Sequence, residues 1–176
     1  MHEEKLEVYK KLLQAYSGAT DLVSPRLLAE LEPRTRAALG YGVFIPPGSR
    51  VLDVGSGAGL PGVPLAIFRP DLEVMLTEVR KRRAAFLELV VARLGLPNLH
   101  LEPGDVRLGQ VKFGFFTAQA VGSFTEVFSL VSARAWPESV LISQRNQVGV
   151  LPPGAVRIRS LPFEQTRTIA VDVMVG

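Results

Sequence analysis

The stretch that most constrains the fold is VLDVGSGAGLPG, at residues 51–62. An apolar run that contains Asp53 leads directly into glycines at positions 55, 57 and 59, and prolines follow at 61 and 64. Glycines at alternate positions let the chain turn and keep Cβ atoms away from a ligand. Prolines are tolerated in the first turn of a helix. The pattern predicts a strand, a bare backbone loop and a helix that begins near Pro61, with its free amides facing a ligand.

The chain after Arg50 alternates between strand-like and helix-like segments. The clearest helix follows Lys81, because apolar residues recur at i, i+3, i+4 and i+7 from Leu87 before Gly95 ends it. Such alternation predicts a parallel sheet with crossover helices. The expected parallel strands are RVLDV, LEVMLTE, NLHLE, FGFFTA and SVLIS. The tail differs, since AVRIRSLPF and TRTIAVDVMV are two alternating runs typical of an antiparallel hairpin.

The first part of the chain is helical in pattern. In EEKLEVYKKLLQAY the apolar side chains share one face, which predicts an amphipathic helix. A second helix is expected through RLLAELEPRTRAAL, kinked or broken at Pro33 and stopped by Gly40. We therefore expect one domain over residues 1–176, with a helical N-terminal appendage at 1–48 and an α/β core at 49–176.

Composition excludes several classes of site. The chain has no cysteine and two histidines, so thiolate metal sites and histidine-centred triads are not expected, and no metal is predicted. It has no apolar stretch of membrane-spanning length, and its charged first residues do not resemble a signal peptide, so a cytoplasmic protein is expected. The net charge of +3 permits a nucleic-acid partner, but charge alone favours a solvated surface.

Two carboxylates indicate which ligand the glycine loop holds. GAGLPG matches the dinucleotide pattern G-x-G-x-x-G, which allows a nicotinamide oxidoreductase. Asp53, however, would repel a pyrophosphate and would suit the ammonium group of a methionine moiety. Glu78, at the end of the next expected strand, can take ribose hydroxyls in either ligand. Asp53 therefore favours an aminoacyl-nucleoside ligand.

The arrangement D-x-G-x-G-x-G resembles the cofactor loop of Rossmann-like S-adenosylmethionine-dependent methyltransferases. The resemblance implies S-adenosylmethionine as cofactor, with its methionine end at the loop, its ribose at Glu78 and its adenine at Asp105 in EPGDV. PGDV is also an ordinary turn sequence, which is the competing interpretation for Asp105. The cofactor-binding residues implied are Asp53, Gly55, Ser56, Gly57, Gly59, Leu60, Glu78, Asp105 and Val106.

A narrower resemblance covers most of the chain. GSGAGLPGVPLAI, RKRRAAFLELVVARLGL, FGFFTAQAV and LPFEQTRTIAVDV resemble the bacterial 16S ribosomal RNA (guanine-N7) methyltransferase family, or glucose-inhibited division protein B. The resemblance implies an α/β fold: a Rossmann-like, seven-stranded, mostly parallel sheet with an antiparallel C-terminal hairpin and an N-terminal helical cap. It also implies methyl transfer to guanine N7 in small-subunit ribosomal RNA.

The chain departs from the family pattern at several positions. Asp21-Leu22-Val23 stands where the family usually has Asn-Leu-Thr, and Gln119 replaces its usual arginine. Ser143-Gln144-Arg145 replaces a typical Leu-Lys-Gly, and the segment that follows is short. These departures leave open a second interpretation, a non-catalytic or altered-specificity paralogue that binds the cofactor, RNA or both.

The expected methyl acceptor, guanine N7, leads to predictions about catalytic residues, partner and substrate-binding residues. Guanine N7 already carries a lone pair, so the chemistry requires positioning rather than a strong base, and no catalytic residue is predicted. The expected partner is ribosomal RNA or the small ribosomal subunit, with no membrane and a monomer by default. Arginines near Glu78 can contact phosphates, although they also fit a solvated helix face. The candidate substrate-binding residues are Gln119, Arg80, Arg82, Arg83 and Arg145.

Overall fold

The computed structural model describes residues 2–17, 24–145, 155–163 and 167–174. The side chain of Arg145 and most side chains of the last two strands lie outside this description, as does the Asp21-Leu22-Val23 segment. The helices are α1 (His2–Ser17), α2 (Pro25–Ala29), α3 (Leu31–Gly42), α4 (Gly62–Phe68), α5 (Lys81–Leu94), α6 (Phe124–Ser132) and the 3-10 turn η1 (Val106–Leu108). The strands are β1 (Arg50–Val54), β2 (Glu73–Glu78), β3 (Leu99–Pro103), β4 (Phe113–Gln119), β5 (Ala135–Arg145), β6 (Ala155–Phe163) and β7 (Arg167–Met174).

Local signals explain most helix ends. Gly95 ends α5 in the left-handed conformation, with a φ of 56°. Ser123 and Glu126 form a reciprocal capping box at the start of α6. The expected kink or break at Pro33 is wrong, because the chain breaks at Glu30 and Pro33 lies in the first turn of α3. A proline there costs nothing, since the N–H groups of the first turn have no partner within the helix. The helix also continues past Gly40 to Gly42.

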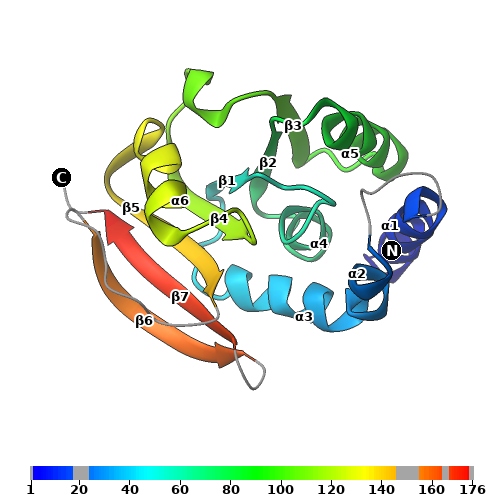
Figure 1. Ribbon diagram of the computed structural model, residues 1–176, viewed down its shortest axis with the longest axis horizontal. Coiled ribbons are helices and arrows are strands. Elements are labelled where there is room, and N and C mark those ends of the chain that lie inside the picture. Colours follow the sequence, from blue (N-terminus) through cyan, green and yellow to red (C-terminus); the bar gives the residue numbers. More distant parts are fainter. Residues whose placement is uncertain (1, 18–23, 146–154, 164–166, 175–176) are drawn as a thin grey trace.

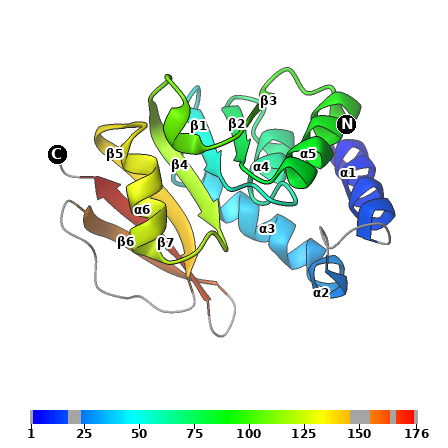
Figure 2. The ribbon, with the colours of Figure 1, turned by 45° about the horizontal axis from the view of Figure 1, so that its top comes forward.

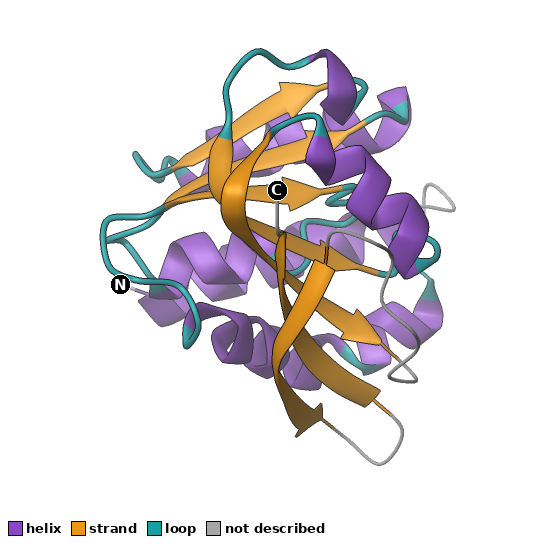
Figure 3. Cartoon of the chain, turned by 90° about the vertical axis from the view of Figure 1, so that its left-hand side faces the viewer, coloured by secondary structure: helices purple, strands orange, loops and turns teal. Residues whose placement is uncertain are grey.

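The strands form one sheet in the order β3-β2-β1-β4-β5-β7-β6. Neighbours from β3 to β5 are parallel, whereas β7 pairs antiparallel with both β5 and β6 (Figures 1 and 3). Helices follow β1, β2 and β4 and return the chain to a parallel strand, as the alternating pattern predicts. The predicted α/β, Rossmann-like class is therefore confirmed.

The helices divide between the two faces of the parallel strands (Figures 1 and 2). α6 covers one face, whereas α3, α4, α5 and the N-terminal α1 lie on the other. On β1, Val51 belongs to the core beneath α4, and Leu52 and Val54 belong to the core beneath α6. Because side chains alternate along a strand, Asp53 points toward the α4 face. The first helix joins the same core through Tyr9 and Leu13, which are fully buried.

Candidate functional site

The glycine loop runs from the end of β1 to the start of α4 and is held against the end of β2. Ser56 N–H donates to the Thr77 carbonyl at 2.8 Å, and Thr77 Oγ1 donates to the Asp53 carbonyl at 3.0 Å. Gly59 has a φ of +99°, and a Cβ there would lie 2.7 Å from Val63. Only glycine fits this position without strain. The loop is therefore a rigid backbone turn with its bare surface at the carboxyl edge of the sheet.

Glu78 lies at the end of β2 and is 4% exposed. Its Oε2 accepts a hydrogen bond from Gly57 N–H at 3.0 Å, and its Oε1 accepts one from Arg80 N–H at 2.8 Å. These two bonds fix the carboxylate between the glycine loop and the start of α5. A carboxylate has about four acceptor positions, so this one keeps capacity for ligand hydroxyls.

Asp53 lies beneath the loop rather than on its surface. It is fully buried, and its Oδ1 accepts a hydrogen bond from Thr117 Oγ1 at 2.7 Å. Its Oδ2 has no hydrogen-bond partner among the described residues, and a Cβ on Gly62 would lie 2.8 Å from that oxygen. Burial raises the pKa of Asp53 to about 6, against the hydrogen bond from Thr117, which lowers it. The carboxylate supports the turn and the start of α4 from below.

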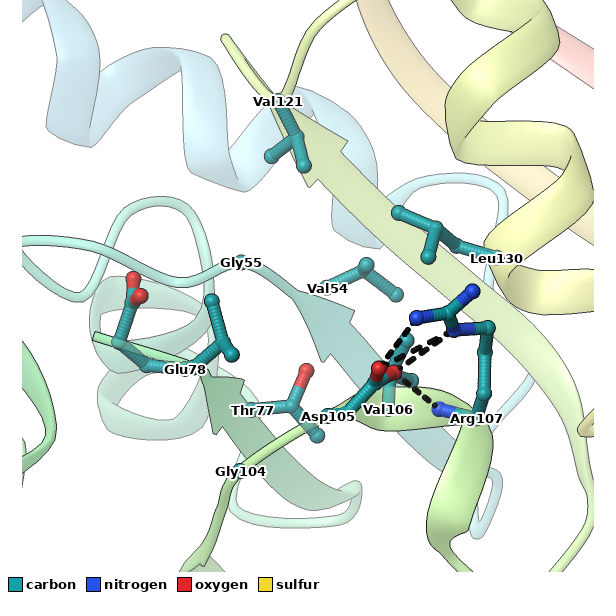
Figure 4. Close-up of a pocket in the computed structure, with 11 residues that line it drawn as sticks. Val54, Gly55, Thr77, Glu78, Gly104, Asp105, Val106, Arg107, Val121 and Leu130 are labelled. Atoms are coloured by element: carbon teal, nitrogen blue, oxygen red, sulfur yellow. Dashed lines mark hydrogen bonds and ion pairs between the residues drawn. The ribbon is translucent and has the colours of Figure 1, made fainter. Parts of the chain in front are cut away.

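A pocket of about 250 Å³ opens beside the loop at the carboxyl ends of β1 and β2. Figure 4 shows its walls, which are mostly apolar, with Glu78 near one end and Asp105 with Arg107 near the other. Its lining residues are Val54, Gly55, Thr77, Glu78, Val79, Gly104, Asp105, Val106, Arg107, Val121 and Leu130. Of the predicted cofactor residues, the pocket brings together Gly55, Glu78, Asp105 and Val106.

The other predicted cofactor residues lie around the turn. Gly57 and Gly59 shape the loop, and Ser56 Oγ donates to the Asp53 carbonyl at 3.0 Å. Leu60, which is 7% exposed, belongs to the hydrophobic core. None of them lines the pocket among the residues that the structure describes. Direct ligand contacts by these residues stay predictions.

Asp105 caps the turn η1 and pairs with Arg107. Its carboxylate accepts hydrogen bonds from the Arg107 N–H at 3.0 Å and from the Arg107 guanidinium. These hydrogen bonds lower the pKa of Asp105 to about 2. The local turn thus accounts for much of this side chain's bonding, and Asp105 is also one of the residues that line the pocket.

The pocket fits S-adenosylmethionine by its chemistry. Apolar side chains from opposite sides, among them Val79, Val106 and Leu130, suit a flat heteroaromatic ring. The Glu78 carboxylate suits ribose hydroxyls, and the loop offers backbone to a polar chain. Val79, Val121 and Leu130 were missed from the sequence, because apolar residues after strand ends look like core. The sequence signal that could have identified them as pocket residues is their position, directly after an expected strand or in the helix that follows it.

A buried arginine also escaped the sequence analysis. Arg134 is fully buried, and its guanidinium donates to both Glu102 carboxylate oxygens, at 2.6 and 3.1 Å. It also donates to the Val111 carbonyl at 2.7 Å and lies 5.2 Å from the centroid of the Phe113 ring. Arg134 therefore ties the segment between β3 and β4, which carries Asp105 and Val106, to the start of β5.

The expected acceptor side is at the ends of β4 and β5. Gln119 is the last residue of β4, and its Nε2 donates to Gln144 Oε1 at 2.5 Å. Arg80 and Arg82 are exposed and Arg83 is half-buried, and within the described ranges none of the three forms a salt bridge. Arg83 Nη1 would lie 3.7 Å from a Cβ on Gly57, so this arginine borders the glycine loop.

The described residues offer neither a metal site nor a membrane-spanning helix. No group of three or more His, Cys, Asp or Glu side chains is placed to hold a metal ion within that part of the chain. No described helix combines the length and apolar character needed to cross a bilayer.

Solved structures and curated proteins resemble this chain. A mutant of MtNAS in complex with S-adenosylmethionine matches with a TM-score of 0.72 and 18% identity, over 100% of this chain and 77% of the other. A SAM-dependent methyltransferase from Aquifex aeolicus matches with a TM-score of 0.61 and 16% identity, over 86% of this chain and 94% of the other. At these identities the likeness is one of fold.

Sequence relatives are more specific. The Ribosomal RNA small subunit methyltransferase G of Pseudarthrobacter chlorophenolicus is 36% identical over 96% of this chain and 82% of its own length. The protein of the same name from Mycolicibacterium smegmatis is 44% identical over 70% of this chain and 55% of its own length. Against several other relatives the chain spans about half of their length. The model of the GidB family, described as rRNA small subunit methyltransferase G, matches residues 2–142. With most of its length matched by that model and by a relative above 30% identity, this chain belongs to the GidB family.

Proposed function

We propose that this chain uses S-adenosylmethionine to methylate guanine N7 in small-subunit ribosomal RNA. The observation that carries the proposal is the fixed carboxylate of Glu78, held by Gly57 N–H and Arg80 N–H beside the pocket. A carboxylate at the end of the second strand can accept both hydroxyls of a ribose. Membership of the GidB family points to small-subunit RNA as the acceptor.

Each part of the pocket has a role in this proposal. S-adenosylmethionine supplies an electrophilic methyl group. The glycine loop receives the methionine end, Glu78 binds the ribose, and Val106 packs against the adenine with Asp105 near its amino group. Asp53 and Thr117 hold the turn from below. The chain's own work is to bind and orient.

The acceptor needs little chemical assistance. Guanine N7 has a lone pair that is not protonated at neutral pH, so no base has to remove a proton before it attacks. The rate then depends on how well the base is placed in line with the methyl group. Gln119, at the carboxyl edge of the sheet, can hydrogen-bond a base without adding charge. This accounts for a site with no histidine or cysteine among its proposed residues.

RNA binding would rest on arginine. Arg80, Arg82 and Arg83 lie at the start of α5, beside Glu78, and their charges are free of salt bridges within the described residues. We assign them and Arg145 to phosphate contacts. The partner would be ribosomal RNA or the small subunit, in the cytoplasm, with the whole chain acting as one domain and as a monomer.

A second candidate is a paralogue that binds cofactor or RNA without methylating guanine N7. The observation that favours it is the pair of neutral amides, Gln119 and Gln144, at positions where the resembling family has an arginine and a lysine. Loss of two cations next to the acceptor would weaken attraction to RNA.

One set of measurements separates these functions. Calorimetry should show that S-adenosylmethionine binds and that NADH does not compete. Incubation with small subunits and with naked small-subunit RNA, followed by nucleoside mass spectrometry, should then reveal 7-methylguanosine. Cofactor binding without any methylated nucleoside would favour the paralogue, and tighter binding of NADH would refute the cofactor assignment.

A further inference from the structure

Two glutamine side chains lie together at the carboxyl ends of β4 and β5. Gln119 and Gln144 are register partners on these strands, and Gln119 Nε2 donates to Gln144 Oε1 at 2.5 Å. The chain then turns through Ala120, and Val121 packs against the glycine loop, where a Cβ on Gly55 would lie 2.9 Å from it. Gln119 therefore lies two residues before Val121, which lines the cofactor pocket, and the amide pair is at the same carboxyl edge of the sheet.

The pair leaves two polar atoms without partners. Gln119 Oε1 and Gln144 Nε2 are buried, and neither has a hydrogen-bond partner among the described residues. Gln119 as a whole is 9% exposed. Buried amide atoms are paired in most proteins, because an unpaired one loses its bonds to water without replacement. A buried donor and a buried acceptor that stay unpaired at the carboxyl ends of the strands, where ligands bind in such sheets, indicate a ligand that completes them.

The pattern of free atoms does not depend on how the amides are turned. Rotating one amide by 180° would place two oxygens or two NH2 groups against each other. The bonded pair therefore always has the NH2 group of one glutamine in contact with the oxygen of the other. Turning both amides keeps the bond and again leaves one acceptor and one donor free. The pair thus offers one acceptor and one donor in every bonded arrangement, and it carries no charge.

This pattern matches the edge of a nucleobase and not a phosphate. Phosphate oxygens only accept hydrogen bonds at neutral pH, so a phosphate would leave the free glutamine oxygen unpaired. Guanine presents a donor, N1–H, next to an acceptor, O6, on its Watson–Crick edge. Unpaired bases in RNA are commonly recognised along that edge.

We propose that Gln119 and Gln144 together bind the acceptor guanine by its Watson–Crick edge, one amide accepting from N1–H and the other donating to O6. N7 lies on the other edge of the purine, so this contact leaves its lone pair free to face the methyl group. The inference rests on the proposed function and adds to it how the base is chosen: by two neutral amides rather than by cations.

The first test is the double variant Gln119→Leu with Gln144→Leu. Replacing both amides removes the unpaired buried atoms, so the melting temperature should stay the same or rise. The KM for small-subunit RNA should rise roughly tenfold or more, from the loss of two hydrogen bonds, while calorimetric affinity for S-adenosylhomocysteine stays the same. Gln110→Leu, an exposed glutamine outside the pair, is the matched control. A lower melting temperature with an unchanged KM would mean that the pair is structural.

The second test observes the amides directly. Nitrogen-15-labelled protein loaded with S-adenosylhomocysteine is titrated with guanosine, inosine and 1-methylguanosine. Guanosine and inosine, which keep N1–H and O6, should shift the side-chain amide signals of Gln119 and Gln144, and 1-methylguanosine should not. No shift with guanosine up to its solubility limit, or equal shifts with 1-methylguanosine, would overturn the inference.

The outcomes also separate this inference from the proposed function. Failure to bind S-adenosylhomocysteine refutes the proposed function. Formation of 7-methylguanosine by a protein whose glutamine amides do not discriminate 1-methylguanosine refutes the inference alone. A Gln119→Arg variant with faster methyl transfer would also contradict it, because an arginine cannot accept a hydrogen bond from N1–H.

Discussion

Tyr9 donates a hydrogen bond from its hydroxyl to the Ala58 carbonyl over 2.8 Å, so the N-terminal helix supports the glycine loop. The Tyr9 side chain is fully buried, and burial raises its pKa, which keeps the hydroxyl protonated and able to donate. A Cβ on Gly59 would lie 3.2 Å from the same hydroxyl, so the packing is close. Helix α1 is thereby a structural part of the candidate cofactor site.

The change Tyr9→Phe removes this hydroxyl and leaves the Ala58 carbonyl without its donor. We expect the free energy of unfolding to fall by about 1 to 3 kcal/mol, and the affinity for S-adenosylmethionine to fall because the loop is less fixed. Urea unfolding and calorimetry measure the two effects. Lys11→Met, an exposed change on the same helix, is the control. Unchanged affinity in Tyr9→Phe would show that α1 does not support the site.

The change Glu78→Gln tests the ribose assignment. Gln keeps the shape of the side chain but replaces an acceptor oxygen with an NH2 group opposite Gly57 N–H or Arg80 N–H. Cofactor binding should weaken by about 1 to 3 kcal/mol, because ribose hydroxyls and one backbone amide lose an acceptor. Glu73→Gln, at the other end of β2, should bind normally. Equal affinities measured by calorimetry would disprove this role for Glu78.

The change Asp53→Asn tests whether the pKa of the buried carboxylate is raised, through the pH dependence of stability. Because the pKa of Asp53 is raised from 3.8 to about 6, the folded state holds a proton more tightly than the unfolded state. Stability from this group is complete below about pH 4 and is lost as the pH rises through 6. At about 1.4 kcal/mol per pKa unit, the loss is roughly 3 kcal/mol. Unfolding free energies from pH 4 to 7 should therefore fall for the native chain relative to Asp53→Asn. Parallel curves for the two proteins would contradict the raised pKa.

The change Arg134→Met tests the support of the pocket wall. It removes the charge that faces Glu102 and the donor to the Val111 carbonyl, so we expect a loss of roughly 2 to 4 kcal/mol of stability. Cofactor affinity should fall as well, since the segment that carries Val106 loses its anchor. Arg93→Met, exposed on α5, is the control. Thermal unfolding and calorimetry report the two effects, and a loss of stability with unchanged affinity would limit Arg134 to a structural role.

The salt dependence of RNA binding tests whether the arginines at the start of α5 contact phosphates. Replacing Arg80, Arg82 and Arg83 by Gln together should lower the slope of log affinity for RNA against log salt by about 2, at roughly 0.7 per phosphate contact with single strands. Cofactor affinity should stay near its original value for Arg80→Gln and Arg82→Gln, whose side chains are exposed. A slope that does not change would place the RNA elsewhere on the protein.

The class of fold and the edge of the sheet at which the pocket lies both follow from patterns in the sequence. The strand, glycine loop and helix at residues 51–62, and the alternation that follows, are local patterns whose hydrogen bonds and hydrophobic faces arise from neighbouring residues. In a parallel α/β sheet, ligands bind at the carboxyl ends of the strands. Glu78 and Asp105 follow from the same rule, because each comes at or just after the end of a strand.

The pairing of polar side chains, in contrast, depends on the three-dimensional arrangement of the chain. The bond between Thr117 and Asp53 joins residues 64 positions apart, the one between Arg134 and Glu102 joins residues 32 apart, and the glutamine pair joins residues 25 apart. Such pairs leave no periodic trace in the sequence, because they depend on strand register and on how the loops cross the sheet edge. The position of Asp53 also depends on the tertiary structure: the alternation of β1 places its carboxylate beneath the loop, fully buried, and its contact with the ligand stays a prediction.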